Sequence, residues 1–174
     1  MIKKIKWIER KFDFNSPVEM FPCILERVRG TPARIEDLIR SFPGNILTIR
    51  INDKWSIQEE VGHLYDLDEL HDARIDDFLS GAKTLRAADM KNQKTYEANH
   101  NTKPIQTVLQ QFRDARMHFV CRLATINEQQ AALVSLHPRL QKPMRLVDMA
   151  YFVAEHDDNH IVNMTEIART LQQS

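Results

Sequence analysis

The sequence of 174 residues contains only four glycines and two cysteines. So few glycines exclude a collagen repeat and argue against a glycine-rich β-fold or a phosphate-binding loop. Cys23 and Cys121 are far apart and form no CxxC motif, so we do not expect a disulfide-framed secreted domain and favour a reduced, cytoplasmic setting. The sequence also lacks a run of eighteen apolar residues, so we predict no membrane-spanning helix and no membrane partner.

Neither sign of charge is in excess, because Lys and Arg together number 24 and Asp and Glu together number 24. A general nucleic-acid-binding protein normally carries a basic excess, so we predict no nucleic-acid partner. Hydrophobic residues make up 43% of the chain, which argues against intrinsic disorder and allows a sizeable core. The length suits a single domain over residues 1–174, with residues 1–16 as an N-terminal extended arm.

Apolar residues recur at helical spacing in four long segments, which predicts an all-α four-helix bundle. In the first segment, Ser16 is expected to be the N-cap, with Pro17 at the first helical position. The glycine and proline at positions 30–32 are expected to interrupt this helix, with Thr31 capping a continuation that ends at residues 43–45.

The other three segments have clearer starting points. Ser56 and Glu59 have the spacing of a capping box at the start of the second helix, and Gly81 is a plausible stop. The third helix is expected to start near Pro104, and the fourth is expected to run from about Arg145 to the end of the chain. Periodicity does not define how the four helices connect in space, so the topology is left open.

Two stretches between these segments lack a long helical pattern. Residues 82–103 are polar, with a short helix expected around residues 90–98. Residues 128–143 contain two prolines and are predicted to form a loop.

His156 and His160 are spaced i, i+4 and therefore lie one turn apart on the same face of the fourth helix. At 100° per residue, both fall in the middle of the apolar stripe, so both rings should point into the bundle. The other members of that stripe are Met149, Phe152, Val153, Met164 and Ile167. Buried imidazoles need partners, so these two are either hydrogen-bonded core residues or ligands that share one divalent ion.

His63 supplies a third candidate ligand, near the edge of the apolar face of the second helix, and Gly62 beside it leaves room for close approach. One histidine from one helix and two from another make a facial set with open coordination positions, which suits a catalytic or ligand-binding metal. The string HDxxH differs from the HExxH of zinc proteases because Asp157 is one methylene shorter than glutamate, so we do not favour a protease.

Arg116 lies in the middle of the apolar stripe of the third helix, and a buried arginine needs an anion. A structural ion pair, with Glu60 as a candidate partner, is preferred over binding of a substrate anion, although Arg116 is kept as a candidate substrate-binding residue. His71 is a second such candidate; it lies two turns from His63, about 12 Å along the helix, and would line a pocket or serve as an alternative ligand. The remaining histidines are expected in loops or on the surface: His100, His118 and His137.

These motifs together resemble the DinB-like superfamily, which includes the YfiT-like proteins. The resemblance covers about Phe21 to Ile167. Its most specific parts are Trp55-Ser56, Glu59, Gly62-His63-Leu64, Glu155-His156 and His160. The stretches Gly30-Thr31-Pro32-Ala33-Arg34 and Phe112-Arg113-Asp114-Ala115-Arg116 also fit.

The resemblance implies a four-helix bundle with a divalent metal, zinc or nickel, held by His63, His156 and His160. It also implies an activity. Members with assigned activities are mostly metal-dependent transferases for low-molecular-weight thiols such as bacillithiol or mycothiol; others resemble hydrolases, and homodimers are common. One position departs from the YfiT-like pattern, in which a further histidine follows the first ligand; here Asp68-Glu69-Leu70 precedes His71.

We therefore expect a metal-dependent enzyme acting on a small molecule, and the resemblance favours a low-molecular-weight-thiol S-transferase. An open position on the metal would help a bound thiol or water lose its proton. A metal-dependent hydrolase is the first alternative. A non-catalytic stress protein that binds a metal or small ligand is the second, and a purely structural helical module is the third.

Overall fold

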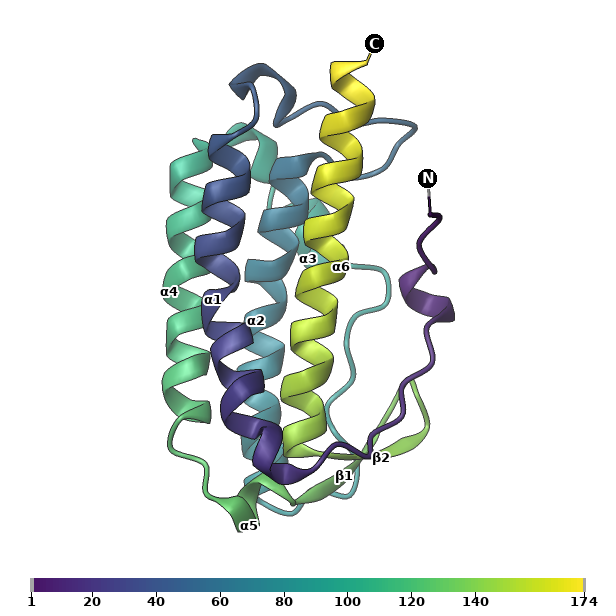
Figure 1. Ribbon diagram of the computed structural model, residues 1–174, viewed down its shortest axis with the longest axis vertical. Coiled ribbons are helices and arrows are strands. Elements are labelled where there is room, and N and C mark those ends of the chain that lie inside the picture. The colour runs from purple at the N-terminus through teal and green to yellow at the C-terminus, as the bar shows by residue number, and fades with distance from the viewer. Residues whose placement is uncertain (1, 174) are drawn as a thin grey trace.

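The computed structural model describes residues 2–173, so Met1 of the predicted arm and Ser174 at the predicted end of the domain lie outside the described residues. Four long helices make up the body of the molecule (Figure 1): α1 (Phe21–Arg40), α2 (Ile57–Leu79), α4 (Ile105–Leu123) and α6 (Leu146–Gln172). Strands within the described residues are confined to one two-stranded sheet. The predicted all-α four-helix bundle is confirmed.

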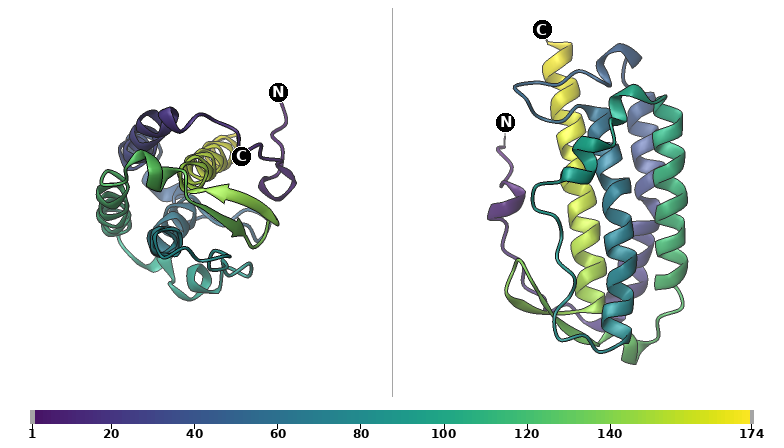
Figure 2. Two further views of the ribbon diagram at one scale, coloured as in Figure 1. Left: turned by 90° about the horizontal axis from the view of Figure 1, so that it is seen from below. Right: turned by 180° about the vertical axis from the view of Figure 1, so that it is seen from behind.

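Helices α1 and α2 each pack against both α4 and α6. In Figure 1, α1 and α6 run upward along the chain, whereas α2 and α4 run downward. Because α2 and α4 are parallel, the connection over residues 80–104 has to return along the length of the bundle, which Figure 2 shows from behind. This connection contains α3 (Gln93–Glu97) and a 3₁₀ turn (His100–Thr102), so the predicted short helix is confirmed.

The start of α2 has the predicted capping box. The backbone N–H of Glu59 donates to Ser56 Oγ at 3.2 Å, and the backbone N–H of Ser56 donates to the Glu59 carboxylate at 2.9 Å. These bonds satisfy two N–H groups that the helix itself leaves unpaired. Gly81 follows the end of α2 with φ of 72°, a left-handed conformation that favours glycine, so the predicted stop is also confirmed.

The predicted start and interruption of the first helix are wrong. A 3₁₀ turn (Val18–Met20) precedes α1, and no side chain caps it, so Ser16 is not the N-cap. Helix α1 then continues through Pro32, which is buried inside it. Thr31 does not cap a second helix; its hydroxyl donates to Asp157 of α6 at 2.8 Å. An interior proline normally destabilises a helix by ~3 kcal/mol, and here its ring is buried in the core, so tertiary packing outweighs the local preference.

The predicted loop over residues 128–143 contains structure that periodicity missed. It includes α5 (Glu128–Ala131), β1 (Val134–His137) and the first half of β2 (Lys142–Arg145). The two strands are antiparallel and pair Val134 with Arg145 and His137 with Lys142. An isolated bridge from Thr84 to Leu136 joins the hairpin to the long connection. The hairpin therefore closes the lower end of the bundle in Figure 1.

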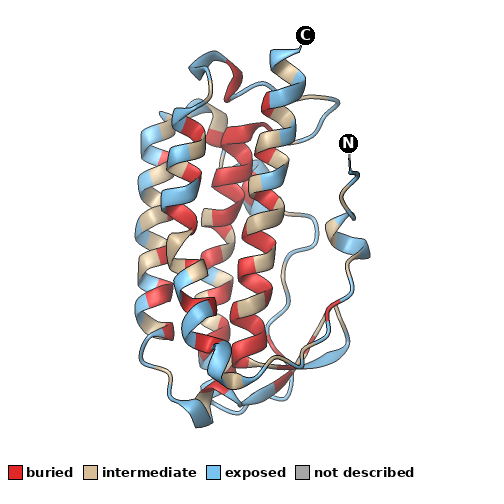
Figure 3. Ribbon diagram, in the orientation of Figure 1, coloured by how far each residue is buried: buried red, intermediate tan, exposed pale blue. Residues whose placement is uncertain are grey.

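The core consists of two apolar clusters with a buried polar layer between them. One cluster includes Val28, Phe78 and Phe119, and the other includes Ile35, Leu64 and Phe112. The residues of the polar layer are Thr31, Asp68, Arg116 and Asp157, all of them buried. Figure 3 shows buried residues continuing along the inner faces of the helices through this layer.

Residues 2–16 form an extended arm with one 3₁₀ turn (Trp7–Glu9). The Trp7 ring packs against Phe152 of α6 at 5.0 Å between ring centroids, and Arg10 forms an ion pair with Glu155 of the same helix. The predicted arm over these residues is therefore confirmed. In the described part of the chain, every helix is too short or too polar to traverse a lipid bilayer.

Candidate metal centre

Helices α2 and α6 bring the three predicted histidines together. His63, His156 and His160 are all buried, and each offers a ring nitrogen that lies within 4.8 Å of the other two. The closest pair is Nε2 of His156 and Nε2 of His160, which are 3.0 Å apart. The i, i+4 spacing accounts for the pair on α6, and the packing of α2 on α6 adds the third ring.

Two of the three rings have a polar contact at Nδ1 that orients them. His160 Nδ1 donates to the Glu60 carboxylate, which also accepts two bonds of 3.1 Å from the Asn163 amide. His63 Nδ1 lies 3.1 Å from the hydroxyl of Thr95 in α3. When Nδ1 carries the proton, the lone pair of Nε2 is left for a metal ion, which is how histidine ligands are usually oriented.

The third ring, His156, and the protonation state of the site also fit a metal ion. Nδ1 of His156 is buried and has no hydrogen-bond partner within residues 2–173. Burial, together with the charge of neighbouring histidines, lowers the pKa of His63 and of His156 well below 6.5. Both rings are therefore neutral at pH 7, the form that binds metals. Three neutral imidazoles fit a divalent ion such as zinc, nickel or cobalt and leave coordination positions open.

A cavity of about 630 Å³ lies beside the three histidines. The Trp55 ring packs on His63 at 4.4 Å between centroids, and its indole N–H is buried without a partner among the described residues. The N-terminal arm contributes Trp7 to the wall, and the long connection contributes residues 87–90. A cavity of this size, largely lined by apolar side chains, fits a small organic molecule.

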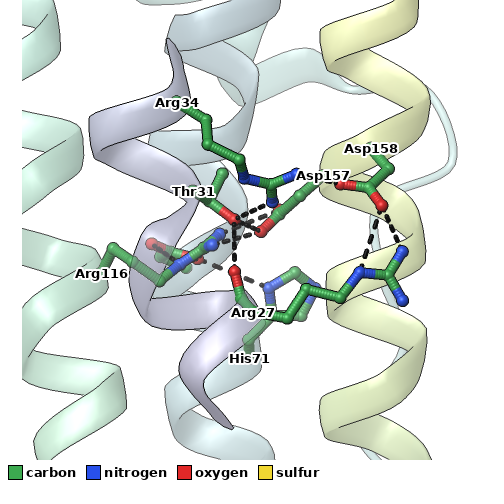
Figure 4. Close-up of polar contacts among 8 residues, drawn as sticks. Arg27, Thr31, Arg34, His71, Arg116, Asp157 and Asp158 are labelled. Atoms are coloured by element: carbon green, nitrogen blue, oxygen red, sulfur yellow. Dashed lines mark hydrogen bonds and ion pairs between the residues drawn. The ribbon is translucent and has the colours of Figure 1, made fainter. Parts of the chain in front are cut away.

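Arg116 lies in the polar layer of the core and does not line this cavity. Its guanidinium donates to Asp68 of α2 and to Asp157 of α6, as Figure 4 shows in part. The predicted partner Glu60 is wrong, because that carboxylate is bonded to His160 and Asn163. Burial lowers the pKa of Arg116, but the two carboxylates outweigh burial and raise it. These contacts support the structural ion pair rather than substrate binding.

The same network explains the role of Asp157. Its carboxylate accepts bonds from Arg116 and from Thr31, so it faces away from the two histidines on its own helix. It is therefore not available as the base that a zinc protease would need.

His71 lines the cavity, as one of its predicted roles requires. Its Nδ1 lies 3.6 Å from Asp68 Oδ1, beyond hydrogen-bond length, and has no closer partner among the described residues. Burial lowers the pKa of His71, so the ring is neutral at pH 7. A role for His71 in substrate binding stays a prediction.

The other histidines differ from expectation in two cases. His118 is exposed, as predicted. His100 and His137 are both buried, at 0% and 2% exposure, because the long connection and the hairpin fold back onto the bundle. His100 Nε2 lies 2.9 Å from Asp66, and His137 lines the cavity. Both lie outside the four long helical patterns, so helical periodicity gave no sign of this burial.

The chain was compared with protein families, with solved structures and with curated protein sequences. The family model of the DinB superfamily matches residues 27–162. Among solved structures, the chain is similar to YfiT from Bacillus subtilis, described as "a probable metal-dependent hydrolase with an unusual four-helix bundle topology", with a TM-score of 0.79, 18% identity and 94% of each chain covered. No curated protein sequence matches the chain. At this identity, the structural similarity shows the fold alone.

Proposed function

The chain belongs to the DinB superfamily, and we propose that it is a metal-dependent hydrolase of small molecules whose divalent cation is bound by His63, His156 and His160. The observation that carries this proposal is the arrangement of the three buried rings, whose ring nitrogens converge on one point next to a cavity. The description of YfiT as "a probable metal-dependent hydrolase" supports the choice of reaction.

A divalent cation in this position supplies Lewis-acid chemistry, which polarises a carbonyl or phosphoryl group and makes water a stronger nucleophile at neutral pH. The protein's own residues set the conditions for that chemistry. Glu60 accepts the Nδ1 proton of His160, and the Thr95 hydroxyl is hydrogen-bonded to Nδ1 of His63, so that both rings keep their orientation. Trp55 lines the cavity and packs on His63, and its indole N–H, unpaired among the described residues, is available to bind an oxygen atom of the substrate.

Transfer of a low-molecular-weight thiol is the second candidate. The volume of about 630 Å³ is large enough for a small electrophile and part of a thiol together, and three neutral ligands leave positive charge that favours a thiolate. The thiol co-substrate, a homodimeric assembly and a cytoplasmic location remain predictions. A non-catalytic metal- or ligand-binding protein differs from both enzymes in having no turnover.

The first experiment is elemental analysis of protein purified without a histidine tag. We expect about one equivalent of a divalent metal in the wild type and its loss in His63→Ala and His160→Ala. His118→Ala is the matched control, because its ring is exposed and lies outside the cavity. Absence of metal from the wild type after reconstitution with zinc and nickel, or its retention in both ligand variants, would contradict the proposal.

The second experiment identifies the reaction in the metal-loaded protein. A panel of esters, amides and phosphoesters is tested without thiol, and a panel of electrophiles is tested with and without bacillithiol, mycothiol or cysteine. Turnover without thiol that is lost in His160→Ala supports the hydrolase. Turnover that requires a thiol supports the transferase, and metal binding without turnover in either panel supports the non-catalytic protein.

A further inference from the structure

The cavity has a second polar end, away from the three histidines, and this end contains arginine side chains. Arg74 of α2 and two residues of the hairpin region, His137 and Arg139, line it there. Arg74 is only 3% exposed and His137 only 2%. Two arginines and a histidine thus converge in a largely apolar cavity, and none of them is used by the proposed metal centre.

The two arginines lack anionic partners. Arg74 donates from Nε and Nη2 to the backbone carbonyl of Arg86, at 3.1 and 2.9 Å. Nη2 of Arg139 is buried and has no hydrogen-bond partner in the described part of the chain. Within residues 2–173, no carboxylate forms an ion pair with either side chain. The acid that lines the cavity, Asp89, accepts bonds from the backbone N–H groups of Lys91 and Gln93.

Arg116 is a buried arginine with a structural role, and its contacts can be compared with those of Arg74 and Arg139. Its guanidinium is matched by two buried carboxylates, Asp68 and Asp157. A buried charge without a counter-charge is strongly unfavourable. Arg74 is buried and Arg139 is half-buried, and no carboxylate of the described residues lies within ion-pair distance of either guanidinium. The contrast indicates that the counter-charge comes from a ligand.

The ionisation of this end agrees with the geometry. Burial lowers the pKa of Arg74 to about 10, and the nearby charges of Arg139 and Arg86 add to the shift while Asp77 opposes it. Burial and the two arginines also lower the pKa of His137 to about 4. At pH 7 both arginines are therefore charged and His137 is neutral, so this end of the cavity is positive.

Apolar side chains make up much of the cavity wall, although His71 also lies between the two ends. They include Trp7, Ile8, Leu67, Leu70, Met90 and Phe152. The His71 ring lies 6.4 Å from the His156 ring, and Arg74 is three residues further along α2, so the ends are on the order of 10 Å apart. A ligand that spans them has to be elongated, with an apolar middle.

We propose that Arg74 and Arg139 form an anion-binding subsite for a carboxylate or phosphate group at one end of an elongated, apolar substrate whose other end reaches the three histidines. This inference rests on the proposed function, because it assigns the substrate class of the same cavity. Arginine suits the task because its planar fork binds both kinds of anion through two parallel hydrogen bonds.

The test measures binding of three probes with the same tail to the full chain as purified, by isothermal titration calorimetry. Hexanoate and hexyl phosphate carry the two candidate anions, and hexanamide carries none. We expect saturable one-to-one binding of at least one anion, with hexanamide roughly tenfold weaker or more. Which of the two anions binds more tightly identifies the group.

Arg139→Gln is the main variant. Nη2 of Arg139 makes no hydrogen bond among residues 2–173, so the substitution removes no such contact from the fold. It should weaken anion binding roughly tenfold and leave hexanamide binding unchanged. Arg40→Gln, an exposed position with the same loss of charge, is the control and should change neither. Arg74→Gln should act like Arg139→Gln; if loss of its bond to Arg86 unfolds it, Arg139→Gln still decides the test.

Two outcomes would overturn the subsite. One is equal binding of hexanamide and the anions, and the other is anion binding that Arg139→Gln does not weaken, as expected if the anion binds the metal ion instead. The metal content of every sample is measured in parallel. Anion binding that depends on Arg139 in a chain that takes up no metal would refute the proposed hydrolase and leave the subsite standing.

Discussion

Gly62 and His100 pack so closely that a Cβ atom at position 62 would overlap the imidazole of His100. His100 is completely buried and lies next to Asp66, with Nε2 2.9 Å from its carboxylate. This contact holds the end of the long connection against α2. The same connection carries Thr95, whose hydroxyl contacts His63. The absence of a side chain at Gly62 therefore helps to position Thr95 beside the candidate metal centre.

Gly62→Ala should therefore destabilise the protein by about 1–3 kcal/mol, because the added methyl group forces the His100 ring and its segment outward. Gly30→Ala is the matched control, since a Cβ at position 30 of α1 meets no atom within 4 Å. The control should be neutral or up to about 1 kcal/mol more stable, as expected for alanine in a helix. Urea unfolding measures both, and equal midpoints for the two variants would contradict the packing argument.

The sequence predicted those parts of the fold that depend on local interactions. Ser56 and Glu59 interact within one turn, so their spacing was enough to place the start of α2. The predicted interruption of α1 at Pro32 was wrong because the proline is buried in the core, and this tertiary packing is not visible in the local sequence. The hairpin was missed because strands of four residues are too short to show alternation.

For the candidate centre, too, the sequence predicted the local features and missed those that depend on tertiary packing. Helical spacing predicted that His156 and His160 point inward, because this needs only the geometry of one helix. The partner of Arg116 was misassigned because a helical face gives the direction of a side chain but not its depth, and Glu60 lies at a different level from Arg116. Thr95 was missed because only the folded connection brings it to His63.

Glu60 should tune the affinity of the metal centre without binding the ion itself. Glu60→Gln keeps the size of the side chain but removes the charge that faces His160 Nδ1, so we expect metal affinity to fall roughly 10- to 100-fold. Competition with a chromophoric chelator measures the dissociation constant. Glu69→Gln, at an exposed position on the same helix, is the control. An unchanged affinity in Glu60→Gln would show that the contact does not orient the ligand.

The polar layer should matter for stability and not for metal content. Asp157→Ala removes one of the two counter-charges of Arg116 inside the core, and we expect a loss of about 3–5 kcal/mol. Asp158→Ala is the neighbouring control: its carboxylate pairs with Arg27 and Arg34 near the surface, where such pairs contribute about 1 kcal/mol or less.

Unfolding experiments compare these two variants, and elemental analysis follows the metal in each. Similar losses of stability at positions 157 and 158 would show that the ion pair with Arg116 contributes no more than a surface pair. Loss of metal from a folded Asp157→Ala protein would show instead that this layer supports the metal centre directly.

His137 should make the protein less stable in mild acid. Its pKa is about 4 in the folded state, because of burial and the charges of Arg74 and Arg139, whereas an unfolded histidine has a pKa near 6.5. The unfolded chain therefore binds a proton between these values that the folded chain does not. The contribution is fully present above pH 6.5 and is lost as the pH falls toward 4.

The comparison of wild type with His137→Gln isolates this group, because every other titrating side chain, including the three candidate ligands, is common to both. With metal removed by a chelator, the stability advantage of the wild type over the variant should shrink by about 2 kcal/mol between pH 7.5 and pH 5. Urea unfolding at the two pH values measures the change. A difference that stays constant with pH would mean that the pKa of His137 is the same in the folded and the unfolded chain, so that burial and the two arginines do not lower it.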